Sequence, residues 1–228
     1  MYWSDNKDKK VEFVIPDDIV DVVFNIQGKS VPLDNASALS TAIERALPWT
    51  AEHDKIGIHQ IYGAESGNGW LRPENTDNEV LFLSRRQKLT IRVPKDQLED
   101  IQQLTGVTLS IDGHELTVGK SVIRKLSDMN IIFARHVVAT GDSQTEDEFM
   151  QTCADQCASL GIDVKKMMCG LERTIRLPSK QLITRGLMIA DLEKAESIKL
   201  QEHGLGVERK LGCGLFLPQK GIDTANPD

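Results

Sequence analysis

Runs of apolar residues divide the first half of the chain into short segments with recognisable periods. Residues 19–26 are rich in β-branched side chains, and residues 55–62 form a second apolar run. In residues 80–93, aliphatic side chains alternate with polar ones that include Lys88 and Arg92. These patterns predict three strands, and in the third the alternation puts the cations on one sheet face and the aliphatic residues on the other.

Apolar residues at helical spacing separate these strands, at 39–47 and 98–104. Asp34 or Asn35 can cap the first helix, and Pro48 stops it. After the second helix, an Asp-Gly dipeptide predicts a hairpin. The order is therefore strand, helix, strand, strand, helix, strand, which is the split βαβ pattern of a ferredoxin-like sandwich.

The second half of the chain repeats this order. Thr145 and Glu148 have the spacing of a capping box that opens a helix, and Asp191 is expected to cap the next one. Strands are predicted at 130–138, 164–177, 183–190 and 211–217. Two such units predict an α+β fold made of tandem ferredoxin-like domains, also described as RRM-like.

The division between the two units is expected near residue 122. We predict a first domain at 1–122, a second domain at 123–222 and a disordered tail at 223–228. Residues 63–79 are rich in Gly, Asn, Glu and Asp, which predicts a long exposed loop that carries Trp70.

Composition limits the class of protein. No apolar run approaches 18 residues, so no membrane span is predicted, and the first ten residues lack the apolar core of a secretory signal. Four cysteines in a chain without export features favour reduced thiols and a cytoplasmic location. Cys153 and Cys157 share a helix face without a zinc-ligand partner at the usual spacing, which favours core packing.

The charge is uneven along the chain. A formal net charge of −7 and a pI near 5.3 argue against a wholly basic, polyanion-binding surface. Residues 80–94 nevertheless contain four cations and no acid. These cations are Arg85, Arg86, Lys88 and Arg92. They predict one basic track that binds nucleic acid, with a solvated sheet face as the alternative.

Residues 204–218 are the most distinctive stretch. Two Gly-x-Gly pairs lie on either side of two cations, after a predicted helix and before a predicted strand. The residues concerned are Gly204, Gly206, Arg209, Lys210, Gly212 and Gly214. Glycine permits positive φ and close backbone approach, so the amides of such a loop can contact a phosphate backbone. The alternative is a helix C-cap at Gly204 followed by an ordinary turn. Dinucleotide and Walker-type loops follow a strand and open a helix, so a mononucleotide site of those types is not expected.

His59, in a predicted strand beside Tyr62, is the leading candidate for proton transfer. An imidazole with a pKa near 6.5 can take a proton from a sugar hydroxyl at neutral pH, and nearby cations can stabilise the transition state of phosphodiester cleavage. The alternative for His59 is a structural histidine in the core. His53 is a second candidate, and its alternative is a solvent-exposed side chain without a catalytic role. The histidines match no zinc spacing and the acids form no convincing two-metal cluster, so no metal and no cofactor are predicted.

The segment 200–218 resembles the glycine-rich signature of the CRISPR-associated endoribonucleases that cut precursor crRNA at its repeats. Segments 56–59 and 84–94 are similar to its MYXAN-type subgroup. The resemblance implies metal-independent attack of a ribose 2′-hydroxyl on the adjacent phosphate, leaving a 2′,3′-cyclic phosphate and a 5′-hydroxyl. It implies His59 as general base or acid, with His53 or Tyr62 as alternatives, and the glycine loop with Arg209 and Lys210 near the RNA backbone.

The same resemblance implies partners. These are the CRISPR repeat RNA, the crRNA 3′ hairpin that is kept after cutting, and the subunits of a CRISPR effector complex. Gln219 lies where a histidine is expected in close relatives. A binding subunit that holds a crRNA hairpin without cutting it is the main alternative, and a tandem ferredoxin-like sensor of a small metabolite is a more distant one.

Overall fold

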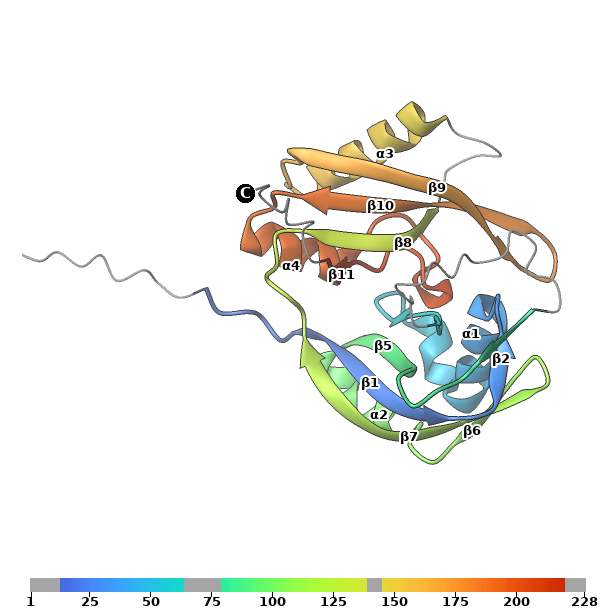
Figure 1. The fold of residues 1–228 in the computed structure, drawn as a ribbon. Coiled ribbons are helices and arrows are strands. Elements are labelled where there is room, and N and C mark those ends of the chain that lie inside the picture. The colour runs from blue at the N-terminus through green and yellow to red at the C-terminus, as the bar shows by residue number, and fades with distance from the viewer. Residues whose placement is uncertain (1–12, 64–78, 139–144, 220–228) are drawn as a thin grey trace, which may run out of the picture.

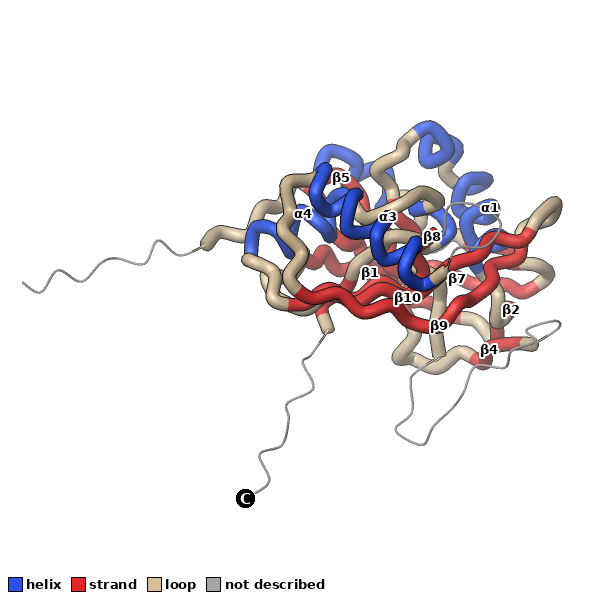
Figure 2. Tube along the Cα trace, turned by 90° about the horizontal axis from the view of Figure 1, so that it is seen from above, coloured by secondary structure: helices blue, strands red, loops and turns tan. Residues whose placement is uncertain are grey.

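The computed structural model of the protein describes residues 13–63, 79–138 and 145–219. Two antiparallel sheets form two layers, one above the other in Figure 1. Seen from above, the helices lie mainly along one side of the molecule and most strands along the other (Figure 2). The predicted tail at 223–228, Trp70 and most of the predicted loop at 63–79 lie outside the described residues.

The first sheet has the strand order β3-β5-β1-β7-β6. Its strands are β1 (Ile19–Gln27), β3 (Gly57–Ile58), β5 (Lys88–Pro94), β6 (Thr108–Ile111) and β7 (His114–Lys125). The accompanying helices are α1 (Ala36–Ala46), η1 (Pro48–Glu52), η2 (Lys95–Gln97) and α2 (Leu98–Gln102). A separate two-stranded sheet joins β2 (Ser30–Pro32) to β4 (Val80–Phe82). Apart from the hairpin partner β6, the order of the main sheet is that of a ferredoxin-like domain.

The second sheet has the order β11-β8-β10-β9, which is the same ferredoxin-like arrangement. Its strands are β8 (Ile132–Val138), β9 (Lys166–Arg176), β10 (Gln181–Ala190) and β11 (Leu217–Pro218). Its helices are α3 (Glu146–Ser159), α4 (Lys194–His203) and the short η3 (Arg209–Leu211). The α+β tandem ferredoxin-like prediction is confirmed.

Each half has its own hydrophobic core. In β5, Leu89, Ile91 and Val93 are fully buried in the first core, as their alternation predicts. Cys153 and Cys157 are free thiols buried in the second core, as their place on one helix face predicts. Burial raises the pKa of Cys153 to about 12, so this thiol is unreactive at neutral pH.

Two local predictions are confirmed, the capping box of α3 and the end of α1, and the predicted cap of α1 is correct in position only. Thr145 forms the capping box of α3: its hydroxyl accepts from the Glu148 amide at 3.3 Å, and its amide donates to the Glu148 carboxylate at 2.9 Å. Asn35 is the N-cap residue of α1, but its side chain makes no cap bond and instead holds the backbone of Ile61, with bonds of 2.9 and 3.0 Å. α1 ends at Ala46, just before Pro48.

Other local predictions are wrong. Residues 80–93 are not one strand, because a turn at 84–87 separates β4 from β5. Asp191 does not cap α4: it has a φ of 61° before the helix, and Glu193 forms the capping box with Glu196. The predicted strand at 211–217 is mostly loop, since β11 contains only Leu217 and Pro218.

The strand β7 continues past residue 122, the predicted end of the first domain. Its last residues still pair with β1, with Ile123 opposite Val22 and Lys125 opposite Val20. The segment after α4 then returns to the first domain and lies between the two layers (Figure 1). A β-carbon on Gly57 would lie 2.5 Å from a methyl carbon of Leu215, which shows how closely this segment packs on β3.

Candidate functional site

A cavity of about 410 Å³ lies where the edge of the first sheet meets the second sheet and the segment after α4. Both halves of the chain line it, including His59, Tyr62, Arg86, Lys88, Arg135 and Gly212. The structure therefore brings together five of the predicted site residues, and adds Arg135 of β8, which sequence analysis missed. Cations, an imidazole and a phenol in one cleft are the groups needed to bind a phosphodiester and move a proton.

His59 directly follows β3 and is held at the sheet edge by its backbone amide, which donates to the carbonyl of Thr90 at 3.0 Å. Its side chain is 11% exposed, and Nε2 is 4.0 Å from Oδ1 of Asp21. Within the described residues Nε2 is buried and has no hydrogen-bond partner. Burial lowers the pKa of His59 to about 4; Asp21 opposes this shift, and Arg92 and Arg209 reinforce it. The ring is therefore neutral at pH 7 and can accept a proton.

Tyr62 forms part of the contact between the two halves. The guanidinium carbon of Arg135 lies 4.4 Å from the centre of its ring, in cation–π geometry. The ring of His136 is parallel to it within 15°, at a centroid distance of 6.4 Å. His136 is itself fixed by Thr184, whose hydroxyl lies 2.8 Å from Nδ1. These contacts set the Tyr62 ring in the cavity wall.

His53 does not join this cavity. It follows η1, and its ring meets Trp49 edge-on at a centroid distance of 5.4 Å. The side chain is half-buried. Of the two predicted histidines, the structure therefore places only His59 beside the basic residues.

Arg85 and Arg86 occupy the tip of the turn between β4 and β5, and both are exposed. The turn is fixed by Gln87, whose Oε1 accepts from the amide and the hydroxyl of Ser84 at 2.7 and 2.6 Å. Lys88 begins β5 and donates to Asn25 Oδ1 at 2.6 Å. The prediction of an exposed basic track fits Arg85 and Arg86, and the half-buried Lys88 continues it into β5.

Arg92 lies on the same face of β5 as Lys88, as the alternation predicts, but it is not part of an exposed basic track. The second half of the chain covers the far end of that face, so the Arg92 side chain is fully buried. Its Nε and Nη2 donate to the two carboxylate oxygens of Asp21 at 2.8 and 2.9 Å. Nη1 donates to the carbonyls of Gln201 and Phe216 at 2.8 and 3.0 Å, so Arg92 joins the two halves of the molecule.

The glycine amides were predicted to be bare and to bind phosphate, but all four already have acceptors within the protein. The amides of Gly204 and Gly206 donate to Leu200 O and Gln156 Oε1 at 2.8 and 2.9 Å. Those of Gly212 and Gly214 donate to the carbonyls of Arg209 and His136 at 3.0 and 2.7 Å. Gly204 and Gly214 are buried. Each amide is satisfied within the protein, so the glycines shape the loop and its packing.

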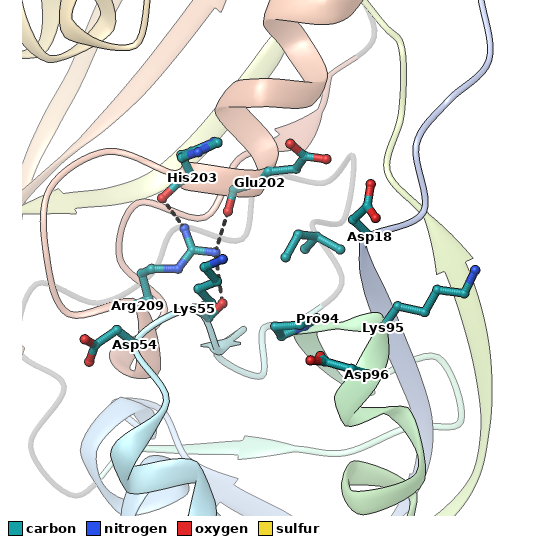
Figure 3. A pocket seen from close by; sticks show the side chains of 10 residues that line it. Asp18, Asp54, Lys55, Pro94, Lys95, Asp96, Glu202, His203 and Arg209 are labelled. Atoms are coloured by element: carbon teal, nitrogen blue, oxygen red, sulfur yellow. Dashed lines mark hydrogen bonds between the residues drawn. The ribbon is translucent and has the colours of Figure 1, made fainter.

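Arg209 and Lys210 likewise bind the protein's own backbone. Arg209 donates to the carbonyls of His203 and Glu202 at the end of α4, and to that of Lys55 at 3.4 Å (Figure 3). Burial lowers its pKa to about 10. Lys210 donates to the carbonyl of Ala51. The expectation that both contact the RNA backbone does not fit these contacts, which tie the loop to α4 and to the first domain.

Within residues 13–63, 79–138 and 145–219, no group of three His, Cys, Asp or Glu side chains has the arrangement of a metal site. Within the same ranges, no helix is long and apolar enough to cross a membrane.

The family model described as "Cas6 Crispr" matches residues 20–221, which include both ferredoxin-like units and the cavity between them. The chain belongs to the Cas6 family. A curated Cas6 relative, "CRISPR-associated endonuclease Cas6" of Myxococcus xanthus (strain DK1622), is 30% identical over 199 residues. The match covers 87% of this chain and 81% of the relative.

Solved Cas6 structures share the fold. One, titled "CRISPR associated protein Cas6", has a TM-score of 0.58 at 11% identity and covers 89% of this chain and 100% of its own. Another is Thermus thermophilus Cse3 bound to an RNA representing a pre-cleavage complex, with a TM-score of 0.50 at 12% identity. That match covers 87% of this chain and 98% of the other. At these identities the likeness shows the Cas6 fold alone.

Asp21 is a second functional candidate that sequence analysis missed, beside Arg135. It is a lone acid among β-branched residues in β1, and the strand register places it opposite Arg92. An acid in a buried strand with a cation on the facing strand is a signal that could have been found. Arg135 gave a similar signal, as a cation within the apolar strand β8.

Proposed function

We propose that this Cas6 protein matures CRISPR RNA: it binds the repeat hairpin of precursor crRNA and cuts it as a metal-independent endoribonuclease. Membership of the Cas6 family and the similarity to an endonuclease of that family support this proposal. The observation that carries it is His59, a neutral imidazole in the wall of a cavity that also holds Arg86, Lys88 and Arg135.

His59 acts as the general base in this proposal. The proton of a ribose 2′-hydroxyl moves to the imidazole while the 2′-oxygen forms a bond to the adjacent phosphorus. The bond from phosphorus to the 5′-oxygen breaks, and the departing oxygen takes a proton from solvent. The products are a 2′,3′-cyclic phosphate and a 5′-hydroxyl. Arg86 and Arg135 stabilise the negative charge that grows on the phosphate oxygens.

The RNA follows the exposed turn at 84–87 into the cavity. Arg85 is exposed and binds a phosphate outside the cut position, while Arg86 and Lys88 line the cavity. Tyr62, whose ring is set in the wall by Arg135, orients the ribose or base at the cut. The glycine segment supports the cavity wall and is not the main phosphate site.

The product hairpin stays bound, and the protein passes it to the subunits of a CRISPR effector complex. Cytoplasm is the proposed location, since the substrate is a transcript and all four cysteines are free. The two ferredoxin-like units are proposed as the two domains, with the division near residue 125 because β7 extends that far.

Incubation with the cognate repeat RNA in excess chelator tests this proposal. A product with a 2′,3′-cyclic phosphate is the expected result. Tight binding of the intact hairpin without cleavage would assign the protein to the non-catalytic hairpin-binding class instead. Absence of both binding and cleavage would reject the proposed function.

A further inference from the structure

Asp21 is the carboxylate beside the proposed base. It lies in the middle of β1 and is only 8% exposed. Its Oδ1 is 4.0 Å from Nε2 of His59, and this nitrogen has no hydrogen-bond partner in the part of the chain that the structure describes. The contact is fixed by topology, because β5 lies between β1 and β3 in the sheet and His59 directly follows β3.

Arg92 keeps Asp21 charged and in place. Burial favours the neutral acid, but the bidentate bonds from Arg92 outweigh it, and the pKa of Asp21 is lowered. Arg92 cannot swing away, since Nη1 is held by the carbonyls of Gln201 and Phe216. A fixed negative charge therefore faces Nε2 of the imidazole.

An ionised carboxylate accepts hydrogen bonds and donates none. An imidazole whose Nε2 faces it is most stable with the ring proton on that nitrogen, which leaves the lone pair on Nδ1. When Nδ1 takes a proton, the ring becomes a cation beside an anion, and the pair is favourable in a site of low polarity.

We propose that Asp21 is a positioning residue for His59: its carboxylate selects the ring form with the proton on Nε2 and stabilises the imidazolium formed during RNA cleavage. The inference rests on the proposed function for its catalytic part. One proton moves, from the 2′-hydroxyl to Nδ1, and Asp21 stays ionised throughout.

Charged groups from three elements act on His59, and they have opposite effects. Asp21 of β1 raises its pKa, whereas Arg92 of β5 and Arg209 of η3 lower it. Lys88 and Arg86 line the same cavity as His59. Removal of Asp21 and removal of Arg92 should therefore shift the pKa of His59 in opposite directions if the pair acts through its charges. A purely structural role of the pair gives no such opposite shifts.

Two single variants distinguish the electrostatic role from the structural role in RNA-free protein. Both Asp21→Asn and Arg92→Gln break the buried pair and lower stability. Asp21→Asn is expected to lower the pKa of His59 below its wild-type value, and Arg92→Gln to raise it. NMR titration of the His59 ring, identified by its loss in His59→Gln, measures both. The same pKa in all three proteins, or shifts of the same sign in both variants, would overturn the inference.

Cleavage supplies the second readout. Asp21→Asn is expected to reduce kcat/KM on repeat RNA at least about tenfold, a part of the 10²- to 10⁴-fold that a positioned general base contributes, while KM changes little. In a His59→Ala background, the same substitution is expected to have no further effect on residual cleavage, because Asp21 acts through His59. A further loss in that background would show a role independent of His59 and overturn the inference.

If Asp21→Asn does not fold, the double variant Asp21→Asn with Arg92→Gln replaces the ion pair by two neutral amides of similar shape. Comparison with Arg92→Gln alone then isolates Asp21: lower kcat/KM in the double variant supports the inference, and equal kcat/KM contradicts it. Wild-type protein that cuts no repeat RNA would reject the catalytic part of the proposed function. The NMR titration tests the link between Asp21 and His59 in either case.

Discussion

A β-carbon on Gly204 would lie 2.5 Å from the carbonyl oxygen of Gly214, so the two ends of the glycine segment are in direct backbone contact. Gly204 has a φ of 70° and Gly214 a φ of 66°. The segment between them carries Arg209, whose bonds reach the end of α4 and Lys55. The glycines thus close a loop whose cation joins the two domains.

Gly204→Ala is therefore expected to destabilise the protein by more than backbone strain alone. Alanine at positive φ costs about 1 kcal/mol. The clash of its β-carbon with the carbonyl oxygen of Gly214 adds to this cost. Gly113→Ala is the matched control, because Gly113 has a φ of 81° but no atom within 4 Å of its β-carbon position. Chemical denaturation of both variants gives the two values. Equal losses would show that the backbone contact is not tight in solution.

His59→Ala is expected to reduce cleavage of repeat RNA by about 10²- to 10⁴-fold, the range of a general base, while hairpin affinity stays close to wild type. His53→Ala is the control, since His53 packs on Trp49 and does not line the cavity. Single-turnover cleavage and gel-shift assays measure the two effects. Loss of cleavage in His53→Ala with full cleavage in His59→Ala would reverse the assignment.

Removal of both exposed arginines, Arg85→Ala with Arg86→Ala, is expected to weaken RNA binding and flatten its salt dependence. Each lost phosphate contact reduces the slope of log K against log salt by about 0.7 to 0.9, so two contacts change it by about 1.5. Lys165→Ala with Lys166→Ala removes the same charge at exposed positions that do not line the cavity. If both double variants change the slope equally, the turn at 84–87 is not a specific RNA contact.

Much of the fold could be predicted from the sequence because it depends on local patterns. The alternation in β5 and the capping box at Thr145 each need only neighbouring residues, and both are present. The predicted single strand at 80–93 was wrong because Gln87 folds residues 84–87 into a turn through its side chain, which hydrophobic periodicity does not detect.

The site was less predictable because its residues meet across the two domains. Arg92 and Lys88 lie on the same face of β5, but Arg92 is buried because the second domain covers it. The glycine segment fits a phosphate loop by composition, but its amides and cations are used by distant partners such as His136 and Ala51. Local sequence shows that an amide or a cation can bind an anion. It does not show whether that amide or cation already forms hydrogen bonds within the protein.

The pH dependence of stability should report the burial of His59. Its pKa is about 4 in the folded protein, against an ordinary value of 6.5. Between these values the unfolded chain binds a proton that the folded protein does not, so the free energy of unfolding falls as pH falls from about 6.5 towards 4. The full pKa shift corresponds to a loss of unfolding free energy on the order of 3 kcal/mol between pH 6.5 and pH 4. Above pH 6.5 the imidazole is neutral in both the folded and the unfolded protein, so this loss does not occur.

His59→Gln removes this titration and keeps a polar side chain. Its free energy of unfolding is therefore expected to decline less than that of the wild-type protein between pH 7 and pH 4.5, when both are measured by urea denaturation. His203→Gln, at an exposed position, serves as the control and should follow the wild type. Parallel curves for wild type and His59→Gln would mean that the imidazole is hydrated and protonates freely, which contradicts a neutral buried base.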